Sequence, residues 1–207
     1  PGIDSLWQVK GNKVLTKKNS VVLEWDNGKG LIFKKTVRLD DKYLFKIKQE
    51  VKNNTSSKID LYPYSQITRN KKPDDVMGFY ILHEGFIGVF DGELKEDDYD
   101  DIKDKKIVRK SDNGWLGITD KYWVAAIVPP KDKNFKSTFL YKDNYRANYI
   151  LNSPVIINPK SSSSNEVRLF VAAKEVETVD GYAESENTEK FDLTIDWGWF
   201  YFFTKPL

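Results

Sequence analysis

The sequence predicts an all-β fold with one short amphipathic helix close to the C-terminus. Between Tyr43 and Val51, apolar and charged residues alternate, which is the period of a strand with one buried and one solvated face. Asp26-Asn27-Gly28 lies between two apolar runs and is a strong β-hairpin signal, because Asn-Gly accepts the positive φ angles of a type I′ turn. Residues 174–185 differ, since their apolar side chains recur at helical spacing.

The predicted strands follow one another at short intervals, separated by turn residues. Pro63 falls inside the run 59–68 and predicts an edge position or a bulge there, because proline cannot donate a ladder hydrogen bond. Glycines divide the run 78–89 into strand, turn and strand. About ten to fourteen strands are expected, within residues 21–25, 30–39, 43–51, 59–68, 78–89, 107–108, 115–118, 122–128, 135–151, 155–157 and 167–173.

Residues 122–128 are apolar at nearly every position and predict a central strand. A strand that is apolar on both faces belongs between two packed layers. Trp123 and Ala125 on one face, and Val124 and Ala126 on the other, are therefore all expected to be largely buried. On this basis Trp123→Ala is expected to cost about 3–5 kcal/mol, as buried aromatic truncations do.

The helix predicted over residues 174–185 has one apolar face. Val176, Val179 and Ala183 recur at helical spacing, with Tyr182 beside them, and this face is expected to pack onto the β body. Gly181 costs such a helix about 1 kcal/mol relative to alanine, so the helix is expected to depend on packing.

Composition excludes several functions. The 207-residue chain carries 33 basic and 31 acidic residues, a net charge of +2, and lacks the clustered basic excess of a nucleic-acid-binding domain. It has no cysteine and a single histidine, so a disulfide scaffold, a cysteine-ligated metal and a two-histidine metal site are excluded. No cofactor motif is found. Neither a signal peptide nor a transmembrane segment is recognised, which predicts either a cytosolic protein or a piece of a larger one.

The acidic residues between Asp91 and Asp104 could suggest a calcium loop. An EF-hand counted from Asp97 would require glycine at Ile102 and glutamate at Val108, so the pattern fails. Lysines are interleaved with the acidic residues, and this segment is predicted to be a solvated loop.

No set of residues forms a coherent active site. His83-Glu84 could be an acid/base couple, but a lone histidine beside a glutamate in a glycine-rich hairpin is more often structural. Ser161–Ser164 lacks the Gly-x-Ser-x-Gly context of a nucleophile. We therefore predict no catalytic, metal or cofactor site, and a binding or scaffolding role instead.

The C-terminal stretch combines an alternating run with a dense aromatic patch. Phe191, Leu193 and Ile195 share one face of an expected extended segment. Rings with a polar edge suit the membrane–water interface, whereas a core-filling terminal strand is the alternative. The predicted membrane-interface residues are Trp197, Trp199, Phe200, Tyr201, Phe202 and Phe203.

Two long motifs carry a family resemblance. Residues 114–129, GWLGITDKYWVAAIVP, and residues 191–200 with 204–207, FDLTIDWGWF and TKPL, resemble the large periplasmic domain of the bacterial YidC membrane protein insertases. Weaker matches include Trp25-Asp26-Asn27-Gly28 and Phe170-Val171-Ala172. In order, the matches cover nearly the whole chain.

The resemblance implies a β-supersandwich of the galactose-mutarotase-like kind over residues 1–190, with 191–207 leading to the membrane interface. It implies a non-catalytic domain on the periplasmic side of a Gram-negative inner membrane, in a multi-pass protein that assists insertion of nascent membrane proteins with SecDF and SecYEG. The C-terminal helix is the implied partner surface, through Glu175, Val176, Val179 and Tyr182. The chain starts inside the family's domain, so the family's first transmembrane helix and earliest strands are missing.

Two alternatives remain open at this point. A carbohydrate-binding module would require aromatic side chains along an open groove rather than in the core. A sugar epimerase would require His83 and Glu84 in a deep cleft, although the second catalytic histidine of such enzymes is absent.

Overall fold

The computed structural model describes residues 1–2, 4–73 and 82–196. Strands dominate the described chain, and they form two main antiparallel sheets and a small two-stranded ribbon. None of the helices in this described part has the length and apolar character that crossing a bilayer requires.

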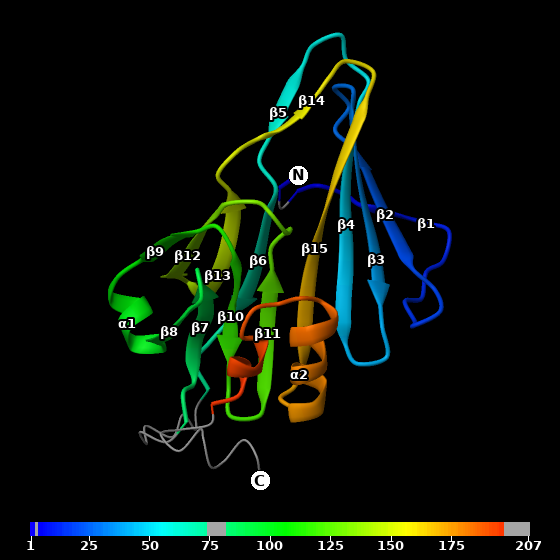
Figure 1. Ribbon diagram of the computed structural model, residues 1–207. Coiled ribbons are helices and arrows are strands. Elements are labelled where there is room, and N and C mark those ends of the chain that lie inside the picture. Colours follow the sequence, from blue (N-terminus) through cyan, green and yellow to red (C-terminus); the bar gives the residue numbers. More distant parts are fainter. Residues whose placement is uncertain (3, 74–81, 197–207) are drawn as a thin grey trace.

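The larger sheet has nine strands, and in Figure 1 it lies between α2 in front and the fainter four-stranded sheet behind. Every pairing in it is antiparallel. In spatial order it consists of β1 (Gln8–Lys10), β2 (Val21–Asp26), β3 (Leu31–Leu39), β4 (Leu44–Asn53), β15 (Ser162–Ala173), β11 (Trp123–Val128), β10 (Gly114–Thr119), β7 (Gly85–Phe90) and β8 (Glu93–Asp98).

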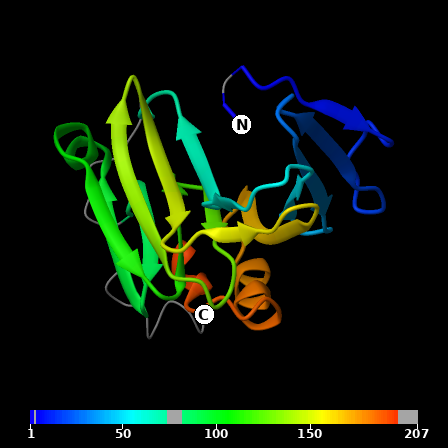
Figure 2. The ribbon, with the colours of Figure 1, turned by 90° about the horizontal axis from the view of Figure 1, so that it is seen from above.

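The second sheet covers only one half of the first. Figure 2 shows it as a separate wall that faces the large sheet, and the wing of β1 to β4 stands apart from it. It consists of β6 (Tyr64–Arg69), β13 (Asn144–Leu151), β12 (Phe135–Lys142) and β9 (Ile107–Ser111), while β5 (Ile59–Leu61) and β14 (Val155–Ile157) pair separately. Pro63 breaks the predicted strand 59–68 into β5 and β6, which belong to different sheets.

One hydrophobic core lies between the two sheets. Its aromatic side chains pack edge to face or tilted, for example Tyr99 on Tyr145 with centroids 4.9 Å apart. The core comprises Phe86, Phe90, Tyr99, Ile102, Leu116, Ile118, Ile127, Phe135, Phe139, Tyr145, Ala147, Tyr149, Leu151 and Val167.

A second core lies on the opposite face of the nine-stranded sheet. There the helix α2 (Val176–Ser185) and the 3₁₀ turn η1 (Phe191–Thr194) cover the central strands. This core comprises Leu44, Ile87, Val89, Trp115, Val124, Ala126, Val128, Phe170, Ala172, Val179, Tyr182 and Phe191. The central strands are therefore covered on both faces over much of their length, but the prediction for residues 122–128 holds only toward the end of β11.

The predicted burial of Trp123 is wrong. Its side chain is 61% exposed, whereas Val124 and Ala126 are buried and Ala125 is half-buried. On the face that Trp123 shares with Ala125 and Ile127, burial increases along the strand, so the second sheet covers the strand's end but not its start. Trp123→Ala should accordingly cost less than about 1 kcal/mol rather than 3–5.

The acidic segment 91–106 is not the solvated loop that its charge predicted. It forms β8 and the helix α1 (Tyr99–Asp104), and it contributes Tyr99 and Ile102 to the core between the sheets. Asp97 is buried because Arg109 donates two hydrogen bonds to its carboxylate, at 2.6 and 2.9 Å. The density of charged residues led us to overlook Tyr99 and Ile102, two apolar residues at positions i and i+3 that share one face of a short helix.

The C-terminal helix starts two residues later than predicted and uses part of the predicted face. Val179 and Tyr182 are buried in the second core, but Val176 is 39% exposed. The following segment is not extended: Lys190 takes a left-handed backbone conformation (φ 53°), and η1 turns Phe191 inward to 1% exposure.

Gly181 offers a test of the helix. The residue is exposed, and a Cβ atom built there meets nothing within 4 Å. Gly181→Ala should therefore raise the free energy of unfolding by about 0.5–1 kcal/mol, because alanine loses less backbone entropy on helix formation. Urea unfolding of both proteins measures the difference, and a destabilised alanine variant would contradict the helical assignment at this position.

Candidate functional surface

Helix α2 is held to the body by its buried tyrosine. The Tyr182 hydroxyl donates a 2.6 Å hydrogen bond to Asp40 Oδ2, and its ring meets Phe170 edge-on at 5.6 Å. Burial, with the neighbouring Asp40 carboxylate, raises the pKa of Tyr182 well above its usual value. The hydroxyl therefore stays protonated and keeps donating at any physiological pH.

A buried arginine fixes the chain just after α2. Arg168 on β15 is 7% exposed, and its Nη1 donates to the carbonyl oxygen of Glu186 at 2.7 Å and to the Thr188 hydroxyl at 3.2 Å. The Glu186 carboxylate also forms an ion pair with Lys46, with 2.7 Å between Oε1 and Nζ. Two strands, β4 and β15, and the end of α2 are thereby joined in one polar network.

Trp115 fixes the next part of the chain. Its indole Nε1–H donates to the Glu189 carbonyl at 3.1 Å, and its ring meets Phe191 edge-on at 5.5 Å. Phe191 also contacts Phe170 at 5.5 Å. The path of the chain from α2 through η1 is thus set by aromatic contacts with β10 and β15.

The hydrogen bonds described for His83 and Glu84 join each residue to a different part of the fold, which is a structural role. The backbone N–H of His83 donates to Asp196 Oδ2 at 2.8 Å, and its ring Nε2 lies 2.9 Å from the Phe86 carbonyl oxygen. Glu84 is buried and accepts the backbone N–H of Lys121 at 3.0 Å. Neither residue lines the cleft between the two sheets.

Lys174 lies beside the end of the described chain. Burial lowers the pKa of its ammonium, while the carboxylates of Asp196, Glu84 and Asp120 act in the opposite direction. Its Nζ donates to the Thr119 hydroxyl at 3.2 Å, and its backbone N–H donates to the Tyr122 carbonyl at 2.9 Å. The hydrogen bond from His83 to Asp196, together with the pairing of Gly85 with Thr119, places Asp196 close to the β10–β11 turn.

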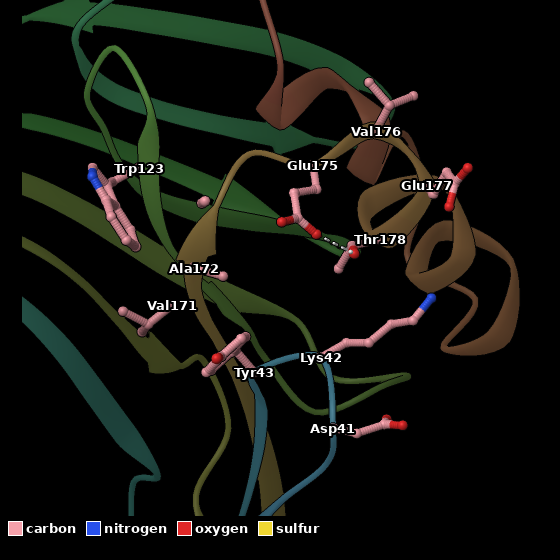
Figure 3. Close-up of a pocket in the computed structure, with 11 residues that line it drawn as sticks. Asp41, Lys42, Tyr43, Trp123, Val171, Ala172, Glu175, Val176, Glu177 and Thr178 are labelled. Carbon is pink, nitrogen blue, oxygen red and sulfur yellow. Dashed lines mark hydrogen bonds between the residues drawn. The ribbon is translucent and has the colours of Figure 1, made fainter.

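A hollow of about 740 Å³ opens at the same end of the molecule. Figure 3 shows Trp123, Val171 and Tyr43 along one side of it, with the first turn of α2 opposite. Sequence reasoning missed Tyr43 and Trp123 as surface residues, because alternation shows which face of a strand a residue takes but not how far the neighbouring layer reaches.

A second hollow, of about 430 Å³, lies in the cleft between the β1–β4 wing and the second sheet. Trp7, Phe33, Tyr62 and Tyr64 line it, and the ammonium of Lys35 lies 4.7 Å from the Trp7 ring centroid. The largest fully buried side chains are mostly aromatic and fill the cores. Among the described residues, the aromatic side chains are thus divided between the cores, this cleft and exposed positions such as Tyr43 and Trp123.

The predicted site residues fall into three groups. Trp197, Trp199, Phe200, Tyr201, Phe202 and Phe203 lie outside the described residues. Glu175 and Val176 are exposed at the start of α2, whereas Val179 and Tyr182 are buried beneath it. Within residues 1–2, 4–73 and 82–196, no three His, Cys, Asp or Glu side chains come together as metal ligands.

The architecture is the galactose-mutarotase-like β-supersandwich. A galactose mutarotase related enzyme from Lactobacillus acidophilus superposes with a TM-score of 0.56 over 80% of this chain and 70% of that chain, at 9% identity. An Escherichia coli putative aldose 1-epimerase superposes with a TM-score of 0.53 over 81% and 68%, at 10% identity. At such identities the likeness defines the fold alone.

Comparison of the sequence with known proteins identifies the family. The family model described as the YidC periplasmic domain matches residues 1–207, and the chain belongs to this family. The membrane protein insertase YidC of Pelagibacter ubique is 48% identical over 207 residues, covering the whole chain and 37% of that protein. Its counterpart in Brucella suis is 41% identical over 214 residues, covering the whole chain and 35% of that protein. The chain thus spans about a third of the length of these relatives.

Proposed function

We propose that this chain is the periplasmic module of a longer, multi-pass inner-membrane insertase, and that its role is positional. The observation that carries the proposal is the second core. There, α2 and η1 are fixed on the central strands by Trp115, Arg168 and Tyr182, so the direction in which the chain leaves the body is rigid. Residues 1–190 would be the body, and 191–207 the segment leading to the membrane interface, whose first residues, Phe191–Thr194, pack on the body.

The module is proposed to be non-catalytic. His83 and Glu84 each make a separate structural contact, and no second histidine exists to complete an acid/base pair. We expect no mutarotase or glycosidase turnover from the purified chain. Measurable epimerisation of an aldose that disappears in His83→Ala would contradict this part of the proposal.

The proposed partners are SecDF, SecYEG and nascent membrane proteins, and no nucleic acid. Glu175 and Val176 are the exposed part of the predicted partner surface. Val179 and Tyr182 would contribute indirectly, by holding α2 in place. The aromatic residues between Trp197 and Phe203 are proposed to lie at the membrane interface.

The test uses an insertase that carries this domain, expressed in cells depleted of their own. Glu175→Arg/Val176→Asp should reduce both co-purification of SecDF and insertion of a membrane-protein reporter. The matched control is Glu93→Arg/Val108→Asp, which changes two exposed residues elsewhere on the body. Equal SecDF recovery from the α2 variant, the control and the parent would contradict the proposed partner surface.

A further inference from the structure

Three apolar side chains form an exposed surface that the described part of the chain leaves uncovered. Tyr43 and Trp123 are each 61% exposed and Val171 is 43% exposed, and all three line one side of the hollow beside α2 (Figure 3). We call these three residues the end platform. Large apolar side chains exposed together on a soluble domain commonly mark a contact surface.

The fold fixes this exposure. The Val171 backbone N–H donates to the Tyr43 carbonyl oxygen at 3.4 Å, so these two residues are neighbours. On the other side of β15, Val171 pairs with Ala125 of β11, two residues after Trp123. The residues that alternate with the platform, Leu44 and Ala172, are buried in the second core, so the platform side chains must point the other way.

Asp40 connects the platform to helix α2. Its Oδ1 accepts the backbone N–H groups of Lys42 and Leu44, each at 2.9 Å, and so shapes the turn in which Tyr43 takes a left-handed φ of 68°. Its Oδ2 accepts the Tyr182 hydroxyl. The platform is therefore rigid with respect to α2.

The platform lies at the end of the body where the described chain stops. Asp196 accepts the backbone N–H of His83, just before β7, and the start of β7 pairs with Thr119 at the end of β10. The chain turns from there to Trp123, the first residue of β11. The residues that follow in sequence include six aromatic side chains between Trp197 and Phe203. The relatives that share this domain are named membrane protein insertases.

We propose that the end platform inserts into the interfacial layer of a lipid bilayer, as a folded contact beside the aromatic C-terminal segment. This inference rests on the proposed function, since it requires the α2 end of the body to face the membrane. Tyrosine and tryptophan rings partition to this layer because the ring is apolar while its O–H or N–H stays hydrated. The charges that line the hollow are mixed, with Asp41, Glu175 and Glu177 against Lys42. Lys121 and Lys174 lie within two residues of Trp123 and Ala173 in the sequence. Binding should accordingly change little with salt or with anionic lipid content.

The absence of cysteine from the chain permits a direct test. Val171→Cys and Val108→Cys, labelled with the fluorophore NBD, compare two valines of similar exposure, 43% and 45%, on different sheets. The complete chain is mixed with phosphatidylethanolamine–phosphatidylglycerol vesicles that contain a doxyl-lipid quencher. The label at 171 should shift to the blue and be quenched by the doxyl lipid, while the label at 108 should not change.

A second pair of variants measures affinity without labels. Tyr43→Ser/Trp123→Ser should weaken vesicle binding about tenfold, an effect expected from losing two interfacial rings. Tyr62→Ser/Tyr64→Ser removes two exposed tyrosines from the cleft instead, and should bind as the parent does.

Three results would overturn the platform proposal. The first is no vesicle binding by the parent chain. The second is a vesicle-bound protein whose label at 171 stays in water, which would leave membrane attachment to the C-terminal aromatics alone. The third is an apolar signal at 171 without vesicles, abolished when the six aromatics between 197 and 203 are changed to serine, which would show that the chain covers its own platform. None of these results bears on SecDF recovery, so the co-purification experiment tests the proposed partner surface independently.

Discussion

Trp115→Ala is expected to lower the free energy of unfolding by about 3–5 kcal/mol, the range for truncating a fully buried aromatic side chain. Trp115 is 0% exposed on β10, an interior strand of the nine-stranded sheet. The substitution opens a cavity in the second core, removes the edge-on contact with Phe191 and deletes the donor to the Glu189 carbonyl. Urea denaturation followed by circular dichroism measures the loss.

The matched control for Trp115→Ala is Trp123→Ala, an identical truncation at an exposed position of the neighbouring strand. It should change stability by less than about 1 kcal/mol. In addition, Trp115→Ala should increase protease cleavage around Glu189, because the contact that holds this segment is gone. Equal losses of stability in the two variants would contradict the packing described for the second core.

Val179→Asp is expected to have an effect of similar size, about 3–5 kcal/mol, because it places an unpaired charge in an apolar core. Val179 is 0% exposed and lies against the central strands under α2. The expected consequence is release of α2 from the body, which hydrogen exchange of the α2 amides would detect as loss of protection.

Val176→Asp provides the control on the same helix. Val176 is 39% exposed in the first turn, where an acidic residue interacts favourably with the helix dipole. Its stability should stay within about 0.5 kcal/mol of the parent. If Val176→Asp proved as destabilising as Val179→Asp, the orientation of α2 would be wrong.

Local sequence rules identified the strands well. Alternation at 43–51 and the Asn27-Gly28 signal correspond to β4 and to the β2–β3 hairpin, where Asn27 Oδ1 accepts the backbone N–H groups of Lys29 and Leu31. The helix near the C-terminus was also confirmed. These features depend on neighbours within a few residues, which the sequence displays directly.

The errors concern contacts between distant residues. The exposure of Trp123 and Tyr43 depends on where the second sheet ends, and this is not encoded near either residue. The 3₁₀ turn at Phe191 depends on the left-handed Lys190 and on the aromatic contacts with Trp115 and Phe170. The burial of Asp97 depends on Arg109, which lies on the next strand, β9, beyond the helix α1. None of these partners follows from periodicity.

The surface at the α2 end was predicted only in part. Helical spacing placed Glu175 and Val176 on a helix, and the family resemblance directed attention to it. The end platform combines residues from a turn and two strands far apart in sequence, so only the folded chain brings them together.

The central claim is that the α2 end of the body faces the membrane, and the orientation of the domain tests it most directly. An insertase carrying this domain would be reconstituted with acceptor-labelled lipid headgroups and a single donor dye at Glu177→Cys or at Ser56→Cys. Glu177 lies on α2, and Ser56 follows the far end of β4, whose ten residues span about 30 Å. The account predicts clearly stronger energy transfer from position 177 than from position 56. Equal transfer, or stronger transfer from position 56, would contradict it.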